Sequence, residues 1–223
     1  MEVVNELMVR GIVVGVFAEN CWIIGNRRTG EGICIDPGDQ PDEVLALARE
    51  MGVSVKYIAN SHAHIDHVLG VDGVQAATGA RFLLHENDAE LLKFGWQQAA
   101  RMMGLRIERG PPDPNAFLRE GDVIDVDGLR LQVIGTPGHT QGSVSFYTEG
   151  MLFSGDTLFH GSIGRTDLPG GDYDQEMSSI CDKLLTLPDD TIVLPGHMDE
   201  TTVGFEKEHN PFVRDWLARR ASR

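Results

Sequence analysis

The sequence predicts an α+β fold in which two packed sheets are flanked by helices. Short apolar runs of strand length recur in both halves of the chain, hairpins are expected in both halves, and helix-type segments lie between them. The 223 residues contain no low-complexity linker and no clear repeat. Residues 1–223 are therefore expected to form one domain, and an apolar content of 41% suits a sizeable core.

The first half of the chain alternates strands with helices. Pro41 opens a helix that runs through Met51, and Gly52 ends it, because proline suits the first helical turn and glycine the position after the last. Further helices are expected over residues 68–78 and 87–103. Strands are expected over residues 9–17, 21–25, 32–36, 55–59 and 81–84.

The second half shows the same alternation after an irregular segment. Residues 106–115 contain Pro111, Pro112 and Pro114, which exclude a regular helix or a central strand. This segment is expected to be a surface excursion, either a plain connector or a loop that covers the substrate. Helices are then expected over residues 174–186 and from Pro211 onward, and strands over residues 123–126, 129–134, 144–148, 151–153 and 191–194.

Composition and charge narrow the function classes. The formal net charge of −15 opposes binding to nucleic acid, which depends on Lys and Arg neutralising phosphates. No apolar run is long enough to span a bilayer, and no positively charged leader precedes the apolar residues 11–18. Cys21, Cys34 and Cys181 are odd in number and are expected to be free thiols, which favours a reducing compartment. We therefore expect a cytoplasmic protein that acts on a small molecule, and leave its oligomeric state open.

Three histidines and an aspartate lie within six residues, in the segment 62–67 (HAHIDH). Histidines at positions i and i+2 in extended backbone project to the same side, so His62 and His64 can hold one ion. Asp66 and His67 follow immediately, and so many crowded donors suit a second ion better than one closed shell. Such crowding has no evident structural purpose, and it predicts a binuclear metal site.

Further donors follow other strand-type runs. His139, Asp156 and His197 each come after an apolar run that ends in a turn, as His62 does. Ligands on loops at one end of a packed sheet are expected to show this arrangement. Taken singly, His139 or His197 would more often be a solvated loop residue, and Asp156 a turn-capping residue. Their assignment as ligands depends on all of them converging.

These motifs resemble the metallo-β-lactamase superfamily, and the resemblance covers nearly the whole chain. Within that superfamily, the segments 154–159 (SGDTLF) and 161–167 (GSIGRTD) look most like the small bacterial glyoxalase II type hydrolases, which cleave hydroxyacylglutathione thioesters. The resemblance implies an αββα sandwich, with two mixed sheets flanked by helices and the site at one sheet edge. It also implies one ion on His62, His64 and His139, a second on Asp66, His67 and His197, and Asp156 bridging both.

The implied chemistry depends on the two divalent ions rather than on a nucleophilic side chain. A water shared by two such ions is acidic enough to supply hydroxide near neutral pH, and this hydroxide would attack the substrate carbonyl. Asp66 would orient the hydroxide by accepting a hydrogen bond. Imidazole and carboxylate donors without cysteine suit zinc first, with iron or manganese as alternatives.

Two more residues are candidates for supporting roles. Asp36 ends a strand and is expected to orient a ligand histidine through its second nitrogen, although it could also be a plain turn aspartate before Pro37. Arg165 follows the bridging aspartate and is expected to bind a substrate carboxylate, with a surface salt bridge as the alternative.

The substrate is less clearly indicated than the chemistry. Full-length glyoxalase II enzymes carry a longer helical C-terminal region and a lysine- and tyrosine-bearing segment that help bind glutathione. Here Arg165 and Asp167 occupy the corresponding stretch, and only residues 211–223 form the tail. The main alternative is an iron-dependent persulfide dioxygenase, followed by a lactonase or other ester hydrolase, or a phosphodiesterase. A true β-lactamase is disfavoured because those enzymes generally lack the bridging aspartate, and a non-catalytic metal-binding protein would not need all seven donors.

Overall fold

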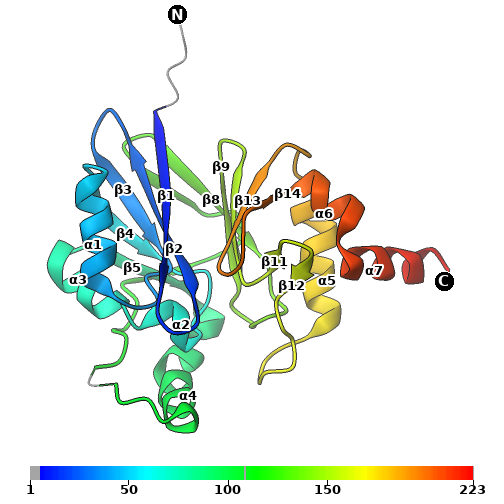
Figure 1. The fold of residues 1–223 in the computed structure, drawn as a ribbon, viewed down its shortest axis with the longest axis horizontal. Helices are drawn as coiled ribbons and strands as arrows, with labels where there is room; N and C mark the ends of the chain where they lie inside the picture. Colours follow the sequence, from blue (N-terminus) through cyan, green and yellow to red (C-terminus); the bar gives the residue numbers. More distant parts are fainter. Residues whose placement is uncertain (1–5, 108, 223) are drawn as a thin grey trace, which may run out of the picture.

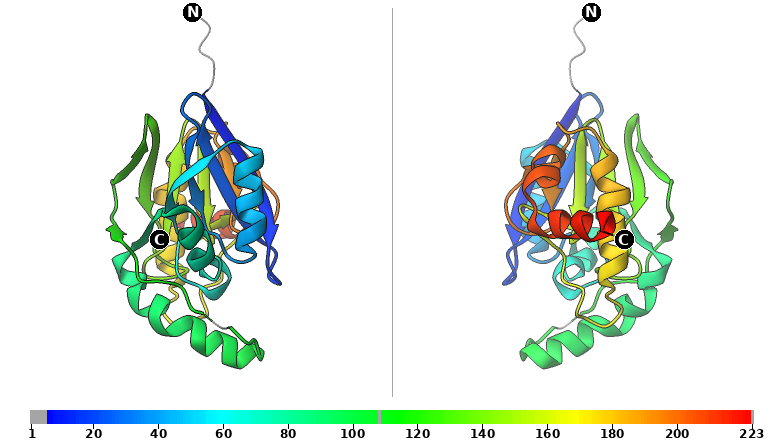
Figure 2. Two further views of the ribbon diagram at one scale, coloured as in Figure 1. Left: turned by 90° about the vertical axis from the view of Figure 1, so that its left-hand side faces the viewer. Right: turned by 90° about the vertical axis from the view of Figure 1, so that its right-hand side faces the viewer.

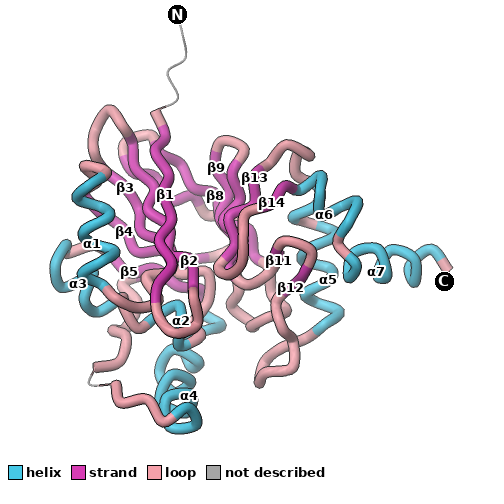
Figure 3. Tube along the Cα trace, viewed as in Figure 1, coloured by secondary structure: helices cyan, strands magenta, loops and turns pink. Residues whose placement is uncertain are grey.

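The computed structural model of the chain describes residues 6–107 and 109–222. Two mixed sheets pack against each other, and helices cover both outer faces (Figure 1). The layers therefore follow the order helix, sheet, sheet, helix. When the trace is coloured by secondary structure, the strands occupy the middle of the molecule and helices flank them (Figure 3).

The first sheet contains β1 to β6 in sequence order. The strands from β1 to β3 are antiparallel, and those from β3 to β6 are parallel. The central strands read as continuous apolar runs because both of their faces are covered. The bounds are β1 Leu7–Val14, β2 Glu19–Asn26, β3 Glu31–Ile35, β4 Ser54–Ala59, β5 Arg81–His85 and β6 Ala116–Leu118.

The second sheet has the order β14-β13-β10-β9-β8-β7. Only β10 and β13 are parallel among its described strands, so their carboxyl ends meet at the same edge. The bounds are β7 Val123–Val126, β8 Leu129–Gly135, β9 Val144–Thr148, β10 Met151–Gly155, β13 Ile192–Pro195 and β14 Thr201–Thr202. A separate small hairpin is formed by β11 Leu158–Phe159 and β12 Ser162–Ile163.

Three apolar layers hold the sandwich together. The layer between the sheets includes Ile33, Leu131, Phe146 and Phe153, all of them buried. Removing such area from water is the main favourable term in folding. A second layer lies under α1 Pro41–Glu50 and α3 Val71–Thr78, and a third lies under α5 Tyr173–Asp182, α6 Val203–His209 and α7 Pro211–Ala221. The predicted α+β sandwich of two mixed sheets flanked by helices is confirmed.

Several predicted helices are shorter or broken. The helix predicted over residues 68–78 is two pieces, α2 Ile65–Val68 and α3, because Gly70 turns the chain and donates its N–H to the carbonyl of Pro37 at 2.9 Å. The helix predicted over residues 87–103 begins as a 3-10 turn at Glu86–Asp88 and a π-helical turn at Leu91–Gly95 before α4 Trp96–Met103. In Figures 1 and 2, α4 lies beyond the lower ends of the strands.

The other differences are at element ends and in very short elements. The strand predicted over residues 9–17 ends at Val14, and residues 15–18 form the hairpin turn. The helix predicted over residues 174–186 stops at Asp182 and is followed by a 3-10 turn at Leu184–Thr186. The sequence did not predict β6, β11, β12, β14 or α6, since elements of so few residues show no measurable periodicity.

The proline-rich segment is irregular, as predicted, and residue 108 lies outside the described residues. Asn115 fixes its far end, where the backbone N–H of Asn115 donates to the carbonyl of Phe82 at 2.8 Å.

Cys21, Cys34 and Cys181 are free thiols. In the part of the chain that is described, no helix is both long and apolar enough to cross a bilayer.

Candidate metal centre

The candidate ligands follow the carboxyl ends of four strands. His62, His64, Asp66 and His67 lie on the loop and short helix after β4, and the other three donors follow β8, β10 and β13. These ends meet at one edge of the sandwich, as the sequence predicts. All seven predicted donors belong to the three-residue groups that the structure brings together there.

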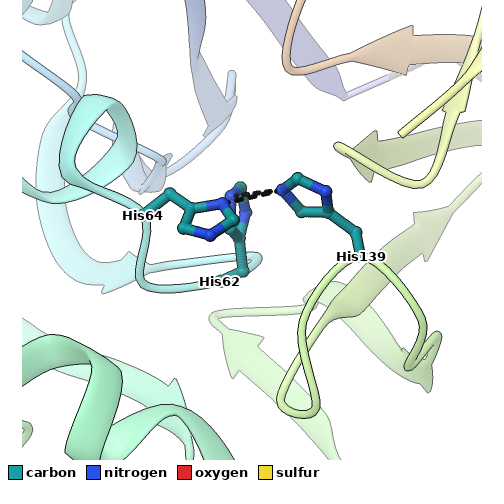
Figure 4. Close-up of side chains that lie close together, drawn as sticks. All are labelled: His62, His64 and His139. Atoms are coloured by element: carbon teal, nitrogen blue, oxygen red, sulfur yellow. Dashed lines mark hydrogen bonds between the residues drawn. The ribbon is translucent and has the colours of Figure 1, made fainter. Parts of the chain in front are cut away.

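The first group is His62, His64 and His139. The Nδ1 atom of His64 and the Nε2 atom of His62 lie 2.8 and 3.2 Å from the Nε2 atom of His139. The three rings come from two separate loops and point toward one another (Figure 4). Three imidazole nitrogens at such a short spacing suit one small cation, because zinc accepts nitrogens at about 2.0–2.1 Å in a tetrahedral arrangement.

The second group is Asp66, His67 and His197. One oxygen of Asp66, Oδ2, lies 3.2 Å from His197 Nε2 and 4.0 Å from His67 Nε2. All three side chains direct a donor atom to a common point, and the group is distinct from the three histidines above. The site thus contains two complete sets of three donors.

Asp156 lies between the two sets. Its Oδ1 atom is 3.4 Å from His67 Nε2, and its Oδ2 atom is 3.6 Å from His197 Nε2 and 3.7 Å from His139 Nε2. The backbone of Gly196 lies close to the Asp156 carboxylate, and a Cβ atom at Gly196 would be only 2.4 Å from Asp156 Oδ1. This contact explains why glycine precedes His197.

The donors differ in their exposure to solvent within both sets. His62, His67 and His139 are buried, whereas the side chains of Asp66 and His197 are 19% and 21% exposed. The site therefore opens to solvent on the Asp66 and His197 side. A substrate would approach from that side.

The electrostatics favour neutral imidazoles at His62 and His64. Burial and then the neighbouring His139 lower the pKa of His64 to about 3, and burial followed by the surrounding histidines lowers the pKa of His62. Neutral imidazole is the form that binds a metal ion. In the second set, burial disfavours the charged form of His67, but the carboxylates of Asp156, Asp36 and Asp66 outweigh burial and raise its pKa. These carboxylates create a position that attracts a cation.

Unpaired polar atoms show that the residues fit a bound cation. His67 Nε2 and Asp156 Oδ1 are buried and have no hydrogen-bond partner among the described residues. Native proteins rarely leave such atoms unpaired, since each costs about 1–3 kcal/mol. Both atoms face the cluster of donors, where a metal ion would satisfy them.

The two residues with predicted supporting roles lie in different surroundings. Asp36 Oδ2 is 3.1 Å from His67 Nδ1, and the same carboxylate accepts hydrogen bonds from the backbone N–H of Ser61 at 2.7 Å and from its hydroxyl at 2.5 Å. Arg165 lies on the surface, where its guanidinium donates to both oxygens of Asp167 at 2.7 and 2.8 Å. Only the carbonyl of Arg165 reaches the cluster, 2.8 Å from His139 Nδ1.

Three buried carboxylates near the site were not predicted. Glu176 Oε2 accepts the backbone N–H of His139 at 2.8 Å, and Asp88 accepts hydrogen bonds from Ala63, Thr140 and Gly142. Glu19 Oε1 lies 3.9 Å from His67 Nδ1. Burial raises the pKa of Glu19 and of Glu176. Nothing in the sequence distinguishes these residues from surface carboxylates, because each reaches the site only through tertiary packing.

Replacing Asp88 by alanine is expected to lower the free energy of unfolding by about 3 kcal/mol, because it removes the acceptor for two buried backbone N–H groups and one hydroxyl. Urea denaturation in the presence of a chelator measures this. Asp88→Asn, which keeps one acceptor oxygen, should lose less than Asp88→Ala. Equal stability of Asp88→Ala and the unaltered chain would contradict the assigned role.

A family comparison agrees with this geometry. Residues 14–197 match the model of the Metallo-beta-lactamase superfamily. The chain belongs to this superfamily. The predicted resemblance is thus confirmed, and the αββα arrangement is shared with solved superfamily members.

Three relatives are similar to this chain over nearly their full lengths. Hydroxyacylglutathione hydrolase GloC from Haemophilus influenzae is 36% identical over 205 residues, which cover 91% of this chain and 96% of GloC. TTHA1623, solved in a di-iron-bound form, is 40% identical with a TM-score of 0.82, covering 91% of this chain and 99% of its own. The BLEG-1 B3 metallo-beta-lactamase is 34% identical with a TM-score of 0.86, covering 92% and 99%.

Proposed function

We propose that this superfamily member is a metal-dependent hydrolase with a binuclear site that cleaves a thioester of the hydroxyacylglutathione type. The observation that carries the proposal is the pair of three-donor groups that share Asp156 at the open end of the sandwich. The relationship to the hydroxyacylglutathione hydrolase GloC supports a thioester as the substrate.

The ligand set proposed from the sequence fits this arrangement. His62, His64 and His139 would hold one ion, Asp66, His67 and His197 the other, and Asp156 would contact both. Two divalent ions bound there supply a Lewis acid for the substrate carbonyl and lower the pKa of a water molecule. These side chains would hold the ions in place because five of the seven follow strand ends on short loops.

Asp66 has a second proposed role in orienting the attacking water. It lies on the open side of the site, and the described contact with His197 involves only one of its two oxygens, Oδ2. A carboxylate oxygen in that position can accept a hydrogen bond from the water and direct its lone pair toward the substrate carbonyl.

An acyl-enzyme route through a serine is disfavoured by geometry. Ser61 Oγ lies 3.0 Å from His62 Nδ1, a spacing that a nucleophile and its base could have. However, Ser61 is only 2% exposed, and its hydroxyl donates to Asp36. A substrate carbonyl could not reach it, so Ser61 serves to position neighbouring groups.

We propose zinc as the first candidate metal and iron as the second, with manganese also compatible with these donors. The di-iron form of TTHA1623 supports iron as a candidate. Purifying the protein from cells grown with each metal and measuring the metal content would decide between them.

The experiment that tests the function is activity profiling of the zinc-loaded and iron-loaded protein. Substrates are S-D-lactoylglutathione, other thioesters, lactones and a β-lactam. We expect thioesters to be hydrolysed with the highest kcat/KM, and preferential turnover of a lactone or β-lactam would contradict the thioester assignment. Oxygen uptake at turnover rates with glutathione persulfide would instead establish the persulfide dioxygenase alternative.

A further inference from the structure

A cavity of about 290 Å³ adjoins the open side of the metal centre. It lies between the turn that joins β1 to β2 and the segment that follows α4, and Asp66 forms part of its wall. Pockets for whole small-molecule ligands usually measure roughly 300–1,000 Å³. This cavity is therefore of a size to hold part of a substrate while the rest lies over the metal centre.

Six of the residues that line the cavity have apolar side chains, and the others are glycines or charged residues. Val16 and Phe17 come from the hairpin turn, and Leu69 and Ile107 lie on other segments. Val16 is 80% exposed, although an apolar side chain at a hairpin tip gains nothing from contact with water. Exposed apolar residues that gather beside a reactive centre commonly mark a ligand-binding surface.

Arg106 and Asp39, two charged residues of the wall, differ in whether they have a partner within the described chain. Arg106 is the one cation among the described lining residues, and it forms no ion pair within the described part of the chain. Asp39, also in the wall, accepts a hydrogen bond from the backbone N–H of Gln40 at 2.7 Å. Because the chain carries a net charge of −15, an anion would approach this cavity only with a local cation to receive it.

We propose that this cavity binds the non-reacting thiol half of the thioester through apolar contacts, and that Arg106 determines specificity by binding a carboxylate at the far end of that half. The inference rests on the proposed hydrolase function and adds a substrate class to it. It assigns to Arg106 the contact that the sequence suggested for Arg165, whose guanidinium is occupied by Asp167.

A pair of probes that differ only in charge tests the assignment. The probes are the acetyl thioesters of 6-mercaptohexanoic acid and of 6-mercaptohexanamide, which have the same length and nearly the same shape. Arg106→Met is expected to raise KM for the acid about tenfold, as for the loss of one charge-assisted contact at a half-open site, and to change KM for the amide less than twofold. The value of kcat should stay unchanged, because the contact is equal in the ground and transition states.

Matched variants separate this role from general effects. Arg109→Met removes an arginine three positions away that pairs with Asp72 at 3.7 Å and does not line the cavity, so both KM values should stay unchanged. Val16→Ser should raise KM for both probes alike, because it shortens the apolar wall. Asp39→Asn should lower KM for the acid alone, because it removes a repulsive charge.

Binding without reaction provides a second readout. The thioethers 6-(methylthio)hexanoic acid and 6-(methylthio)hexanamide cannot be hydrolysed, and their dissociation constants for the metal-loaded protein follow from calorimetry. The acid should bind more tightly than the amide, and this preference should disappear in Arg106→Met and decrease with added salt.

The outcomes distinguish failure of the inference from failure of the proposed function. If the protein hydrolyses thioesters but Arg106→Met changes KM for acid and amide alike, Arg106 does not bind the carboxylate and the inference is wrong. A rise in KM for the acid but not for the amide in an Arg165→Met variant would also overturn the inference. If no thioester is hydrolysed, the proposed function fails, and the thioether preference alone then decides whether the cavity binds anionic chains.

Discussion

Replacing Asp156 by alanine is expected to lower kcat/KM by on the order of 10³-fold or more and to reduce tightly bound metal from two ions to at most one per chain. Asp156 is the residue whose two oxygens face both donor sets, at 3.4 Å from His67 and 3.6 and 3.7 Å from His197 and His139. Its loss removes a shared negative charge between two cations, and metal-ion stabilisation of a transition state amounts to several kcal/mol. Steady-state kinetics with S-D-lactoylglutathione and elemental analysis of the dialysed protein measure both effects.

A control for this change comes from an exposed aspartate. Asp174→Ala alters an exposed residue of α5 that belongs to none of the donor groups, and should leave metal content and kcat/KM unchanged. Circular dichroism of both variants in chelator checks that each is folded. If Asp156→Ala kept two ions and more than about a tenth of the activity, the bridging role would be wrong.

Replacing Asp36 by alanine is expected to weaken metal binding by about 10–100-fold and to destabilise the metal-free protein. Such losses are typical when a residue that orients a metal-binding histidine is removed. Alanine would leave the N–H and hydroxyl of Ser61 and Nδ1 of His67 without their acceptor. It would also place an alanine at a backbone φ of +48°, a left-handed conformation that aspartate and asparagine tolerate better.

Asp36→Asn separates these effects. Asparagine tolerates the left-handed backbone and keeps one acceptor oxygen, so it should retain more stability than alanine while still weakening metal binding. Competition with a chromogenic chelator gives the metal affinity, and thermal unfolding in chelator gives the stability. Unchanged metal affinity in both variants would mean that Asp36 only stabilises the loop at Ser61 and does not orient His67.

Much of the fold was predictable because strands and helices of several turns carry a periodic pattern. The strand over residues 144–148 coincides with β9, and Pro41 opens α1 at its first helical position. The break at Gly70 depends on a tertiary contact, the hydrogen bond from its N–H to the carbonyl of Pro37, and local propensity contains no information about such a contact. The π-helical turn at Leu91–Gly95 was also missed.

The candidate site was also predictable only where the sequence itself carries a local pattern. The cluster at residues 62–67 is unusual in the sequence itself, and each remaining donor follows a strand whose end can be recognised. Asp88 and Glu176 support the site through hydrogen bonds to backbone groups far away in the sequence. Arg165 adjoins the site in the sequence, but its guanidinium turns to Asp167, whereas Arg106 lines the adjoining cavity from a distant segment.

The most direct test of the account is a titration of metal-free protein with zinc in which bound metal and thioester hydrolysis are followed together. Activity is expected to be absent without metal and to reach its maximum when two ions are bound per chain. Full hydrolysis of the thioester by protein shown to be metal-free would contradict the central claim that the seven converging side chains act through bound cations.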